Sequence, residues 1–367
     1  MNSIHRIILL MCISTCLSLS CDMIAEPVKP VVTDVFVGGV EGYNTYRIPS
    51  LILTPQGTLL AFAEARQVKA DAGHVEMVMK RSMDHGKTWE PLKRIIADGP
   101  NRIGDPCPVY DNQTNTLLLL HTHSLGVDTE NAILSGKAKG ERGVFVTTST
   151  DQGATWSTPV NITKDVKDPN WTWYATGPGV AIQLEVGEHK GRIVVPANHA
   201  LAGSKKYESH TFYSDDHGKT WKMGGITGVL GNESQVVELS DGSVMANMRS
   251  YRGKGLRAVS ISKDGGQTFG DIADDSTLIE PVCQASLTRF TRDGKQGLLF
   301  CNPASKSRNN LTLRVSEDDG KTWPRDYCIE KGASAYSCMA VLPDTTVGVL
   351  YERGNYSHIS FQRLPIP

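Results

Sequence analysis

Seven polar side chains of this chain could bind and transform an anionic ligand if folding brings them together. They are three arginines, three carboxylates and one tyrosine, namely Arg47, Arg249, Arg308, Asp71, Glu233, Glu352 and Tyr336. Three guanidinium groups directed at one point form a permanently charged trap for a carboxylate, because arginine binds carboxylates in planar, bidentate geometry. These residue types therefore predict a ligand that carries a carboxylate.

The remaining side chains indicate how such a ligand could react. An anionic nucleophile would be repelled by the ligand's own carboxylate, whereas a neutral tyrosine would not. The ordinary pKa of a tyrosine is about 10, so Tyr336 would need a base, and Glu233 is the candidate. Asp71 would then act as the general acid toward the leaving oxygen. The charge of Glu352 would hold Arg47 in place.

A repeated eight-residue motif indicates the scaffold that must position these side chains. The pattern Ser-x-Asp-x-Gly-x-Thr-aromatic starts at Ser82, Ser149, Ser214, Ser262 and Ser316. In the third copy, Asp216 can accept hydrogen bonds from turn amides, Gly218 permits a positive φ, and Trp221 is a large apolar anchor. The starts differ by 67, 65, 48 and 54 residues, close to the roughly 40 to 50 residues of a propeller blade plus its loops.

The five copies of this motif are called boxes below. The runs of residues between the boxes predict the strands. In the first repeat, apolar runs at 46–54, 58–66 and 74–82 are separated by turn signals. First strands begin near Arg47, Asp105, Gly177, Glu233, Cys283 and Tyr336. Second strands end near Arg66, His123, His199, Arg249, Asn302 and Glu352. Six first strands indicate an all-β fold, a six-bladed β-propeller of four-stranded antiparallel blades over 31–367, whose last blade closes with the amino-terminal strand 31–36.

Successive strands alternate in direction. First strands therefore begin, and second strands finish, on the side of the fold opposite the boxes. Asp71 and Arg308 are predicted in loops at that same end, where a propeller directs its strands toward the axis. Arg66 also ends a strand there and is a candidate neighbour of the ligand. A surface ion pair is the default interpretation of any single arginine. Three arginines together with a Tyr-Glu pair outweigh that default.

Composition limits the partners of the chain. Its 367 residues carry a formal net charge of −1 and are 40% hydrophobic, with 35 glycines. Nucleic acid or an anionic membrane surface would require a basic field, so neither is expected as the main partner. We see no pattern for a metal or a cofactor, since His121-Thr-His123 is better explained as strand-end polarity. No obligate protein partner is indicated.

The amino terminus is predicted to be a targeting segment. Arg6 precedes an apolar run at 7–19 that is too short to span a bilayer comfortably and is typical of a signal peptide within 1–25. Cleavage is expected near Ser20 or a little beyond Ala25. The alternative is a bacterial lipoprotein signal, with cleavage before Cys21. Either signal implies export, to a secreted or periplasmic location or to a lipid-anchored position at the cell surface.

The cysteines beyond this segment leave two alternatives open. There are five of them, Cys107, Cys283, Cys301, Cys328 and Cys338. An odd number leaves at least one unpaired. Cys283 and Cys301 flank a predicted turn and could form a cross-strand disulfide, but buried free thiols are the favoured interpretation.

The motifs around the candidate residues resemble those of exo-α-sialidases (neuraminidases) of the bacterial and animal Asp-box family, over 31 to the end of the chain. They are Tyr46-Arg47-Ile48-Pro49, Thr176-Gly177-Pro178-Gly179, Asn232-Glu233-Ser234-Gln235, Asn247-Met248-Arg249-Ser250, Ala335-Tyr336-Ser337 and Tyr351-Glu352-Arg353-Gly354, with Arg308 and the five boxes. The resemblance implies a retaining exo-α-sialidase that hydrolyses terminal sialic acid from glycoproteins, glycolipids or oligosaccharides through a tyrosyl-sialosyl intermediate. Its partners would be sialylated glycans, with no cofactor.

The resemblance also implies roles for the residues that match. Arg47, Arg249 and Arg308 would form the carboxylate triad. Asp71 would be the acid/base and Tyr336 the nucleophile. Glu233 would be the partner of Tyr336, and Glu352 would hold Arg47. The alternative is a catalytically silent Asp-box propeller that binds glycans or proteins, which would be expected to have lost such residues. The run Trp171, Trp173, Tyr174 either packs the fold, which is favoured, or contacts the leaving group.

Overall fold

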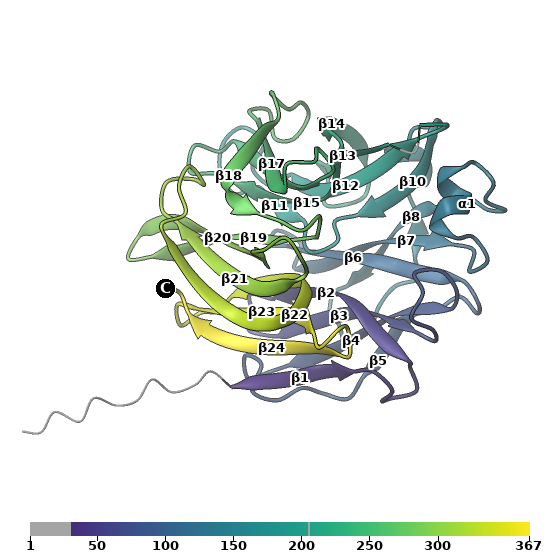
Figure 1. Cartoon of the computed structure of the whole chain (residues 1–367), viewed down its shortest axis with the longest axis horizontal. Helices are drawn as coiled ribbons and strands as arrows, with labels where there is room; N and C mark the ends of the chain where they lie inside the picture. Colours follow the sequence, from purple (N-terminus) through teal and green to yellow (C-terminus); the bar gives the residue numbers. More distant parts are fainter. Residues whose placement is uncertain (1–30, 205) are drawn as a thin grey trace, which may run out of the picture. The chain divides into compact units, whose positions relative to one another are not determined.

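The computed structural model describes residues 31–204 and 206–367. The predicted signal segment 1–25, with its alternative lipid site at Cys21, lies outside the described residues. Within them, helix is limited to two short segments, α1 (Glu130–Leu134) and α2 (Thr163–Val166), and the rest is strands and the turns that join them (Figure 1). The predicted all-β class is therefore confirmed.

The first and second repeats lie in one sheet with the order β2-β3-β4-β6-β7-β8-β9, in which β5 pairs with β4. The strands of the first repeat are β2 (Thr45–Leu53), β3 (Leu59–Arg66), β4 (Val75–Ser82) and β5 (Lys93–Ile96). Those of the second are β6 (Arg102–Asp111), β7 (Thr116–Ser124), β8 (Gly143–Ser149) and β9 (Val160–Asn161). The link between the two repeats is a single parallel pair, Val75 with Arg102.

The third and fourth repeats form separate sheets. The third has the order β10-β12-β13-β14, and the two-residue β11 (Ile182–Gln183) pairs with β12. Its other strands are β10 (Trp171–Thr176), β12 (Ile193–Leu201), β13 (Tyr207–Ser214) and β14 (Lys222–Val229). The fourth sheet consists of β15 (Gly231–Glu238), β16 (Val244–Ser250), β17 (Leu256–Ser262) and β18 (Ala273–Ile279).

The last sheet contains both ends of the described chain, in the order β1-β24-β23-β22-β21-β20-β19. Its strands are β1 (Val32–Val37), β19 (Ser286–Arg292), β20 (Lys295–Pro303), β21 (Asn309–Ser316), β22 (Arg325–Val341), β23 (Thr346–Arg353) and β24 (His358–Pro365). Figure 1 shows β1, in purple, beside β24, in yellow, and the two strands pair in antiparallel register. The predicted closure by the amino-terminal strand is confirmed.

The first strands of successive repeats contact one another in a closed cycle. Contacts run from β2 to β6, then to β11, β15, β19 and β22, and from β22 back to β2. Apolar side chains are buried between neighbouring sheets, as where Val109 and Leu120 meet Val195 and Phe212. Since burial of apolar surface is the main favourable term in folding, these layers hold the cycle together and place the beginnings of the first strands near one another.

The turn that follows β13 has the hydrogen bonds that its sequence predicts. The amides of Gly218 and Thr220 donate to Ser214 Oγ and Asp216 Oδ1, at 2.8 and 2.9 Å. Gly218 has a φ of +79°, and Trp221 is buried. The same two bonds recur after β4, β8, β17 and β21. Each turn thus satisfies its own amides and reverses the chain at the end opposite the first-strand beginnings.

Two predicted strand starts, Gly177 and Tyr336, are wrong by six residues or more, and two others, Asp105 and Cys283, are wrong by three. The third repeat begins at β10, six residues before Gly177, and Pro178, which has no amide hydrogen, interrupts the strand until β11. Tyr336 lies inside the long strand β22 rather than at its start. There the last strand of the fifth repeat continues directly into the first strand of the sixth, and no turn separates them.

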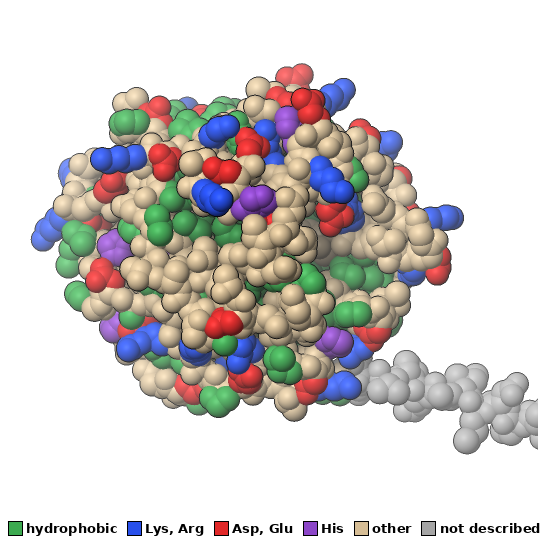
Figure 2. All heavy atoms as spheres, turned by 180° about the vertical axis from the view of Figure 1, so that it is seen from behind, with side chains coloured by type: hydrophobic (Ala, Val, Ile, Leu, Met, Phe, Trp, Pro, Cys, Tyr) green, Lys and Arg blue, Asp and Glu red, His purple; other side chains and the backbone are tan. Residues whose placement is uncertain are grey.

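Basic and acidic side chains are interspersed on the face of the molecule shown in Figure 2. This mixture agrees with the formal net charge of −1. In the part of the chain that the structure describes, no helix has the length and the apolar composition needed to cross a membrane.

A buried ion pair supports the end of β16. Arg257 and Glu280 are both fully buried, and Arg257 Nη1 donates to Glu280 Oε2 at 2.8 Å. The other oxygen of Glu280 accepts from the amide of Ser250 at 2.6 Å, next to Arg249. This carboxylate therefore neutralises a buried guanidinium and fixes the strand end that carries a candidate site residue.

Replacing Glu280 with alanine is expected to lower the free energy of unfolding by about 3–5 kcal/mol, because the charge of Arg257 would remain buried without compensation. Denaturant unfolding of both proteins would measure the difference. The matched control is Asp271→Ala, which removes an exposed carboxylate of the same repeat and should change the free energy of unfolding by less than about 0.5 kcal/mol. Equal values for the two variants would contradict a stabilising role for the pair.

Candidate active site

A cavity that is open to solvent lies where the first strands begin. Its lining includes seven of the eight residues named from the sequence, namely Arg47, Arg66, Asp71, Glu233, Arg249, Arg308 and Tyr336. The eighth, Glu352, contacts Arg47 from below the cavity surface. The structure therefore brings together residues from the first, fourth, fifth and sixth repeats, as the alternation of strands predicts.

Glu352 connects the first and sixth repeats. It is 1% exposed, and Arg47 Nε donates to its Oε1 at 2.6 Å. The same carboxylate accepts from the amides of Ile48 and Tyr336, at 2.9 and 3.1 Å. Ile48 has a φ of +58°, an uncommon conformation for a β-branched residue, which persists only where the surroundings enforce it. Glu352 thus fixes both Arg47 and the backbone of Tyr336.

Tyr336, Glu233 and Arg249 form one hydrogen-bonded group. The hydroxyl of Tyr336 donates to Glu233 Oε1 at 2.5 Å, and Arg249 Nη1 donates to Glu233 Oε2 at 2.8 Å and to the Tyr336 hydroxyl at 3.2 Å. Burial, together with the negative charge of Glu233, raises the pKa of Tyr336 well above its ordinary value, although Arg249 acts in the opposite direction. The phenol is therefore protonated, and its proton points at a carboxylate that could accept it.

The other two arginines flank the ring of Tyr336. The Cζ atoms of Arg47 and Arg308 lie 5.5 and 5.6 Å from the centre of that ring. Arg308 donates from Nη1 to the hydroxyl of Tyr356 at 3.1 Å and from Nη2 to the carbonyl of Val282 at 3.3 Å. The three guanidinium groups therefore surround one phenol, and this arrangement can bind a carboxylate beside the Tyr336 hydroxyl.

Asp71 lies at the rim of the cavity, in the loop between β3 and β4. Its side chain is 67% exposed and pairs with Arg66 Nη1 at 2.5 Å. Partial burial acts to raise the pKa of Asp71, but the charge and hydrogen bond of Arg66, helped by Arg47 and Arg102, outweigh it and hold that pKa below its usual range. The free protein therefore has an ionised Asp71 at neutral pH.

The buried carboxylate of Glu64 fixes the position of Arg66. Glu64 is fully buried, and Arg66 Nε donates to it at 3.0 Å. Arg102 Nη2 and the amide of Asp105 donate to its other oxygen, at 2.6 and 2.9 Å. Because buried charges are tolerated only when paired and hydrogen-bonded, this network fixes the orientation of Arg66 toward Asp71.

Sequence reasoning missed several residues that line the cavity. Asp105 was noted only as a strand start, yet it pairs with Arg142 at 2.5 Å and with Arg102 at 3.3 Å. These two guanidinium groups outweigh the burial of Asp105 and lower its pKa to about 2. An anionic side chain that is paired with two arginines therefore lines the cavity. No repeated motif marks it, so burial and contacts were needed to find it.

An aromatic wall forms another side of the cavity. Trp173, Tyr207 and Tyr251 line it; the rings of Tyr207 and Tyr251 are stacked with centroids 5.6 Å apart. Of the predicted aromatic run, Trp171 and Tyr174 are buried, as the packing interpretation expected, and Trp171 stacks on His199. Trp173 alone of the three lines the cavity.

The favoured interpretation of the cysteines is confirmed, because Cys283 and Cys301 are free and buried. In residues 31–204 and 206–367, no group of three or more His, Cys, Asp and Glu side chains is arranged to hold a metal ion. His121 donates or accepts a hydrogen bond with Thr147 at 3.1 Å and stacks on Phe145.

Comparisons with known proteins agree on one family. A family model described as a BNR repeat-like domain matches residues 49–349. The chain is 37% identical to a sialidase of Micromonospora viridifaciens over 349 residues, 89% of this chain and 53% of the relative. It is 32% identical to sialidase-2 of Mus musculus over 356 residues, 87% of this chain and 92% of the relative. A solved Hadza microbial sialidase matches with a TM-score of 0.82 and 32% identity, over 90% of this chain and 67% of that chain. This chain thus spans about half the length of the Micromonospora viridifaciens protein.

Proposed function

This chain belongs to the sialidase family with BNR repeats, and from that premise we propose that it is a retaining exo-α-sialidase. Its substrates would be glycoproteins, glycolipids or oligosaccharides that end in α-linked sialic acid. The observation that carries the proposal is the placement of three guanidinium groups around Tyr336, whose hydroxyl donates to Glu233. Sialic acid is a sugar with a carboxylate on its anomeric carbon, so a carboxylate trap beside a nucleophile matches it.

In the first step, Arg47, Arg249 and Arg308 bind the substrate carboxylate. The oxygen of Tyr336 forms a bond to the anomeric carbon while Glu233 takes the phenolic proton. The bond to the leaving oxygen breaks, and Asp71 supplies the proton that this oxygen gains. The product of the step is a sialosyl-tyrosine, and the leaving alcohol departs.

In the second step, Asp71, now ionised, removes a proton from water as the water oxygen attacks the anomeric carbon. The bond to Tyr336 breaks, and the phenolate recovers its proton from Glu233. Two displacements at one carbon restore the original configuration, so we propose retention. Sialidases are a recognised exception to the pair of carboxylates that most glycoside hydrolases use, since a tyrosine takes the place of the anionic nucleophile.

The fold is proposed to be a six-bladed propeller with five Asp boxes. Support comes from the closed cycle of first strands and from the recurrence of one turn after β4, β8, β13, β17 and β21. On this view the long β22 serves two blades, and β1 completes the last one. Export of the chain, by secretion or with a lipid on Cys21, also remains a proposal, and the amino-terminal residue of the purified mature protein would test it.

Release of sialic acid is the direct test of the activity. We expect the protein to hydrolyse a fluorogenic aryl sialoside and at least one of a panel of sialyllactoses of defined linkage. The panel would also give the linkage preference. Binding of sialosides without release from any of them would instead indicate a catalytically silent propeller.

Replacing Arg308 or Arg249 with alanine is expected to lower kcat/KM about 10- to 150-fold, because each change removes a charge-assisted bond worth roughly 1.5–3 kcal/mol. Lysine should rescue only in part, since it lacks the planar pair of donors. The matched control is Arg252→Ala. Arg252 is a neighbouring arginine that pairs with Asp274 and does not line the cavity. Unchanged kcat/KM in both site variants would remove the carboxylate trap from the mechanism.

A further inference from the structure

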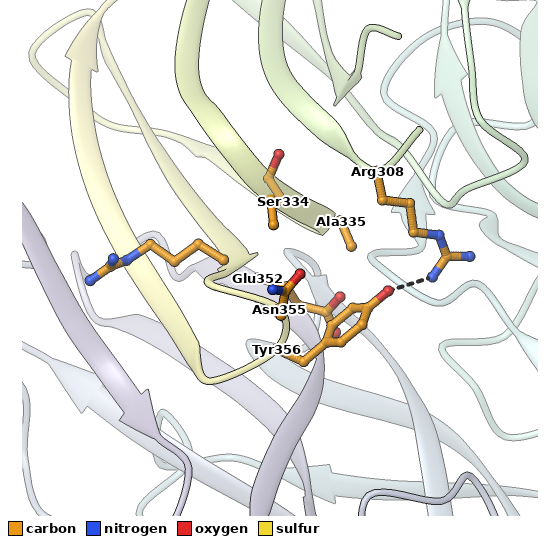
Figure 3. Close-up of a pocket in the computed structure, with 8 residues that line it drawn as sticks. Arg308, Ser334, Ala335, Glu352, Asn355 and Tyr356 are labelled. Atoms are coloured by element: carbon orange, nitrogen blue, oxygen red, sulfur yellow. Dashed lines mark hydrogen bonds between the residues drawn. The ribbon is translucent and has the colours of Figure 1, made fainter. Parts of the chain in front are cut away.

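Arg308 differs from the other two arginines of the proposed triad in how its charge is balanced. Arg47 pairs with Glu352, and Arg249 pairs with Glu233. Among the described residues, Arg308 has no carboxylate within ion-pair distance. Its Nη1 donates instead to the hydroxyl of Tyr356, at 3.1 Å (Figure 3).

Tyr356 contacts a second arginine of the triad through its ring. The Cζ atom of Arg47 lies 4.0 Å from the ring centre of Tyr356, well within the range of a cation–π interaction. One side chain thus holds Arg308 by its hydroxyl and Arg47 by its face, although these arginines come from different repeats. Tyr356 does not line the catalytic cavity. It lines two adjoining hollows, one of which is drawn in Figure 3, so it reaches the arginines from outside the ligand position.

The backbone at Tyr356 is constrained. The turn between β23 and β24 places Asn355 and Tyr356 at φ values of +53° and +68°. Left-handed backbone is uncommon for a bulky residue such as tyrosine and persists where the surroundings enforce it. Thr45 Oγ1 donates to the carbonyl of Tyr356 at 3.1 Å, and the amide of Gly354 donates to the carbonyl of Ala333 at 3.0 Å. These bonds attach the turn to β2 and β22, the strands that carry Arg47 and Tyr336.

A phenol at this position has an electrostatic consequence. A carboxylate beside Arg308 would also accept its hydrogen bond, but it would neutralise the guanidinium and repel an incoming carboxylate. The neutral hydroxyl of Tyr356 fixes the side chain and leaves its positive charge for the ligand. We propose that Tyr356 is a positioning residue that orients Arg308 and Arg47 while keeping the charge of Arg308 uncompensated. This inference rests on the proposed binding of a sialic acid carboxylate by the triad.

The test compares two ligands that differ only in the carboxylate, 2-deoxy-2,3-didehydro-N-acetylneuraminic acid and its methyl ester. Calorimetry on the full chain is expected to show that Tyr356→Phe weakens binding of the acid about 3- to 10-fold, the loss of one hydrogen bond, and leaves the ester unchanged. Tyr356→Glu should weaken binding of the acid by at least a further order of magnitude, because it adds a competing charge. Tyr351→Phe, which removes a buried hydroxyl from the neighbouring strand, is the matched control and should match the parent protein.

Coupling to Arg308 provides a second readout. If the hydroxyl acts through Arg308, Tyr356→Phe should change acid binding by less than about 2-fold in an Arg308→Ala background. This comparison does not need the Tyr356→Glu protein to fold. Equal losses for acid and ester, or a full loss in the Arg308→Ala background, would overturn the inference and leave the proposed function intact. Parent protein that binds neither ligand would overturn both.

Discussion

Tyr336→Phe is expected to lower kcat/KM for a fluorogenic sialoside on the order of 10³-fold or more. The substitution removes only the oxygen that is proposed to attack the anomeric carbon. The ring and its contacts with Arg47 and Arg308 would remain, so binding of the unsaturated sialic acid analogue should change little. A large loss of kcat with an intact binding constant would separate chemistry from positioning.

The covalent intermediate can be sought directly. A 3-fluorosialosyl fluoride should react with the parent protein and leave a stable sialosyl group on the peptide that contains Tyr336, because the ring fluorine slows breakdown of the intermediate. Peptide mass spectrometry would locate the group. Glu233→Gln should slow this labelling about 10²- to 10⁴-fold, since the base that accepts the phenolic proton at 2.5 Å would be lost.

Two results would exclude a tyrosine nucleophile. One is a label on a carboxylate such as Glu233 or Asp71. The other is an inverted first-formed product, which proton NMR of a freshly started reaction would detect. Tyr351→Phe serves as the control for the trapping experiment, because Tyr351 lies in β23, does not line the cavity and should not affect the label.

The pairing of Arg47 with Glu352 was within reach of the sequence. Turns are short and successive strands alternate in direction. The first residue of a first strand and the last residue of a second strand therefore lie at the same end of the fold. The hydrogen bonds within the turn 214–221 were predictable for a similar reason, because all the groups involved lie within eight residues. Such contacts depend on local rules that the chain repeats.

The network below Asp71 could not be predicted in this way. Glu64 and Arg66 are two residues apart in β3, so they share a face of that strand. Their burial is decided by β6, which supplies Arg102 and Asp105 from another repeat. The only signal in the sequence was a charged pair inside an otherwise apolar strand. Tyr356 left less trace, because its left-handed backbone and its contact with Arg308 arise only when the turn packs against two other strands.

Asp71→Ala is expected to lower the rate of sialyllactose cleavage about 10²- to 10⁴-fold, because a sugar alcohol is a poor leaving group and needs a proton as the bond breaks. An aryl sialoside should keep much of its first-step rate, since its phenol leaves with little help. The position of Asp71 agrees with this distinction. Its side chain is 67% exposed at the rim and pairs with Arg66, whereas the guanidinium groups of the triad lie around Tyr336.

The first step must be measured by itself. Asp71 is also proposed to activate water in the second step, so steady-state turnover of the aryl sialoside could fall even when the first step is fast. Rapid mixing would record the burst of released phenol. The matched control is Asp98→Ala, an exposed aspartate that pairs with His123 outside the cavity, and both substrates should react with it at the parental rate.

The pH dependence provides an independent check of the same assignment. Arg66 and its neighbours hold the pKa of Asp71 below its usual range, so the free protein gains the acid form only as the pH falls. The value of kcat/KM depends on the protonation state of the free protein. The ratio of kcat/KM for sialyllactose to kcat/KM for the aryl sialoside should therefore rise as the pH is lowered. This rise should be absent in Asp71→Ala. Equal first-step losses for both substrates, with a flat ratio in the parent protein, would mean that Asp71 positions the loop and that another group donates the proton.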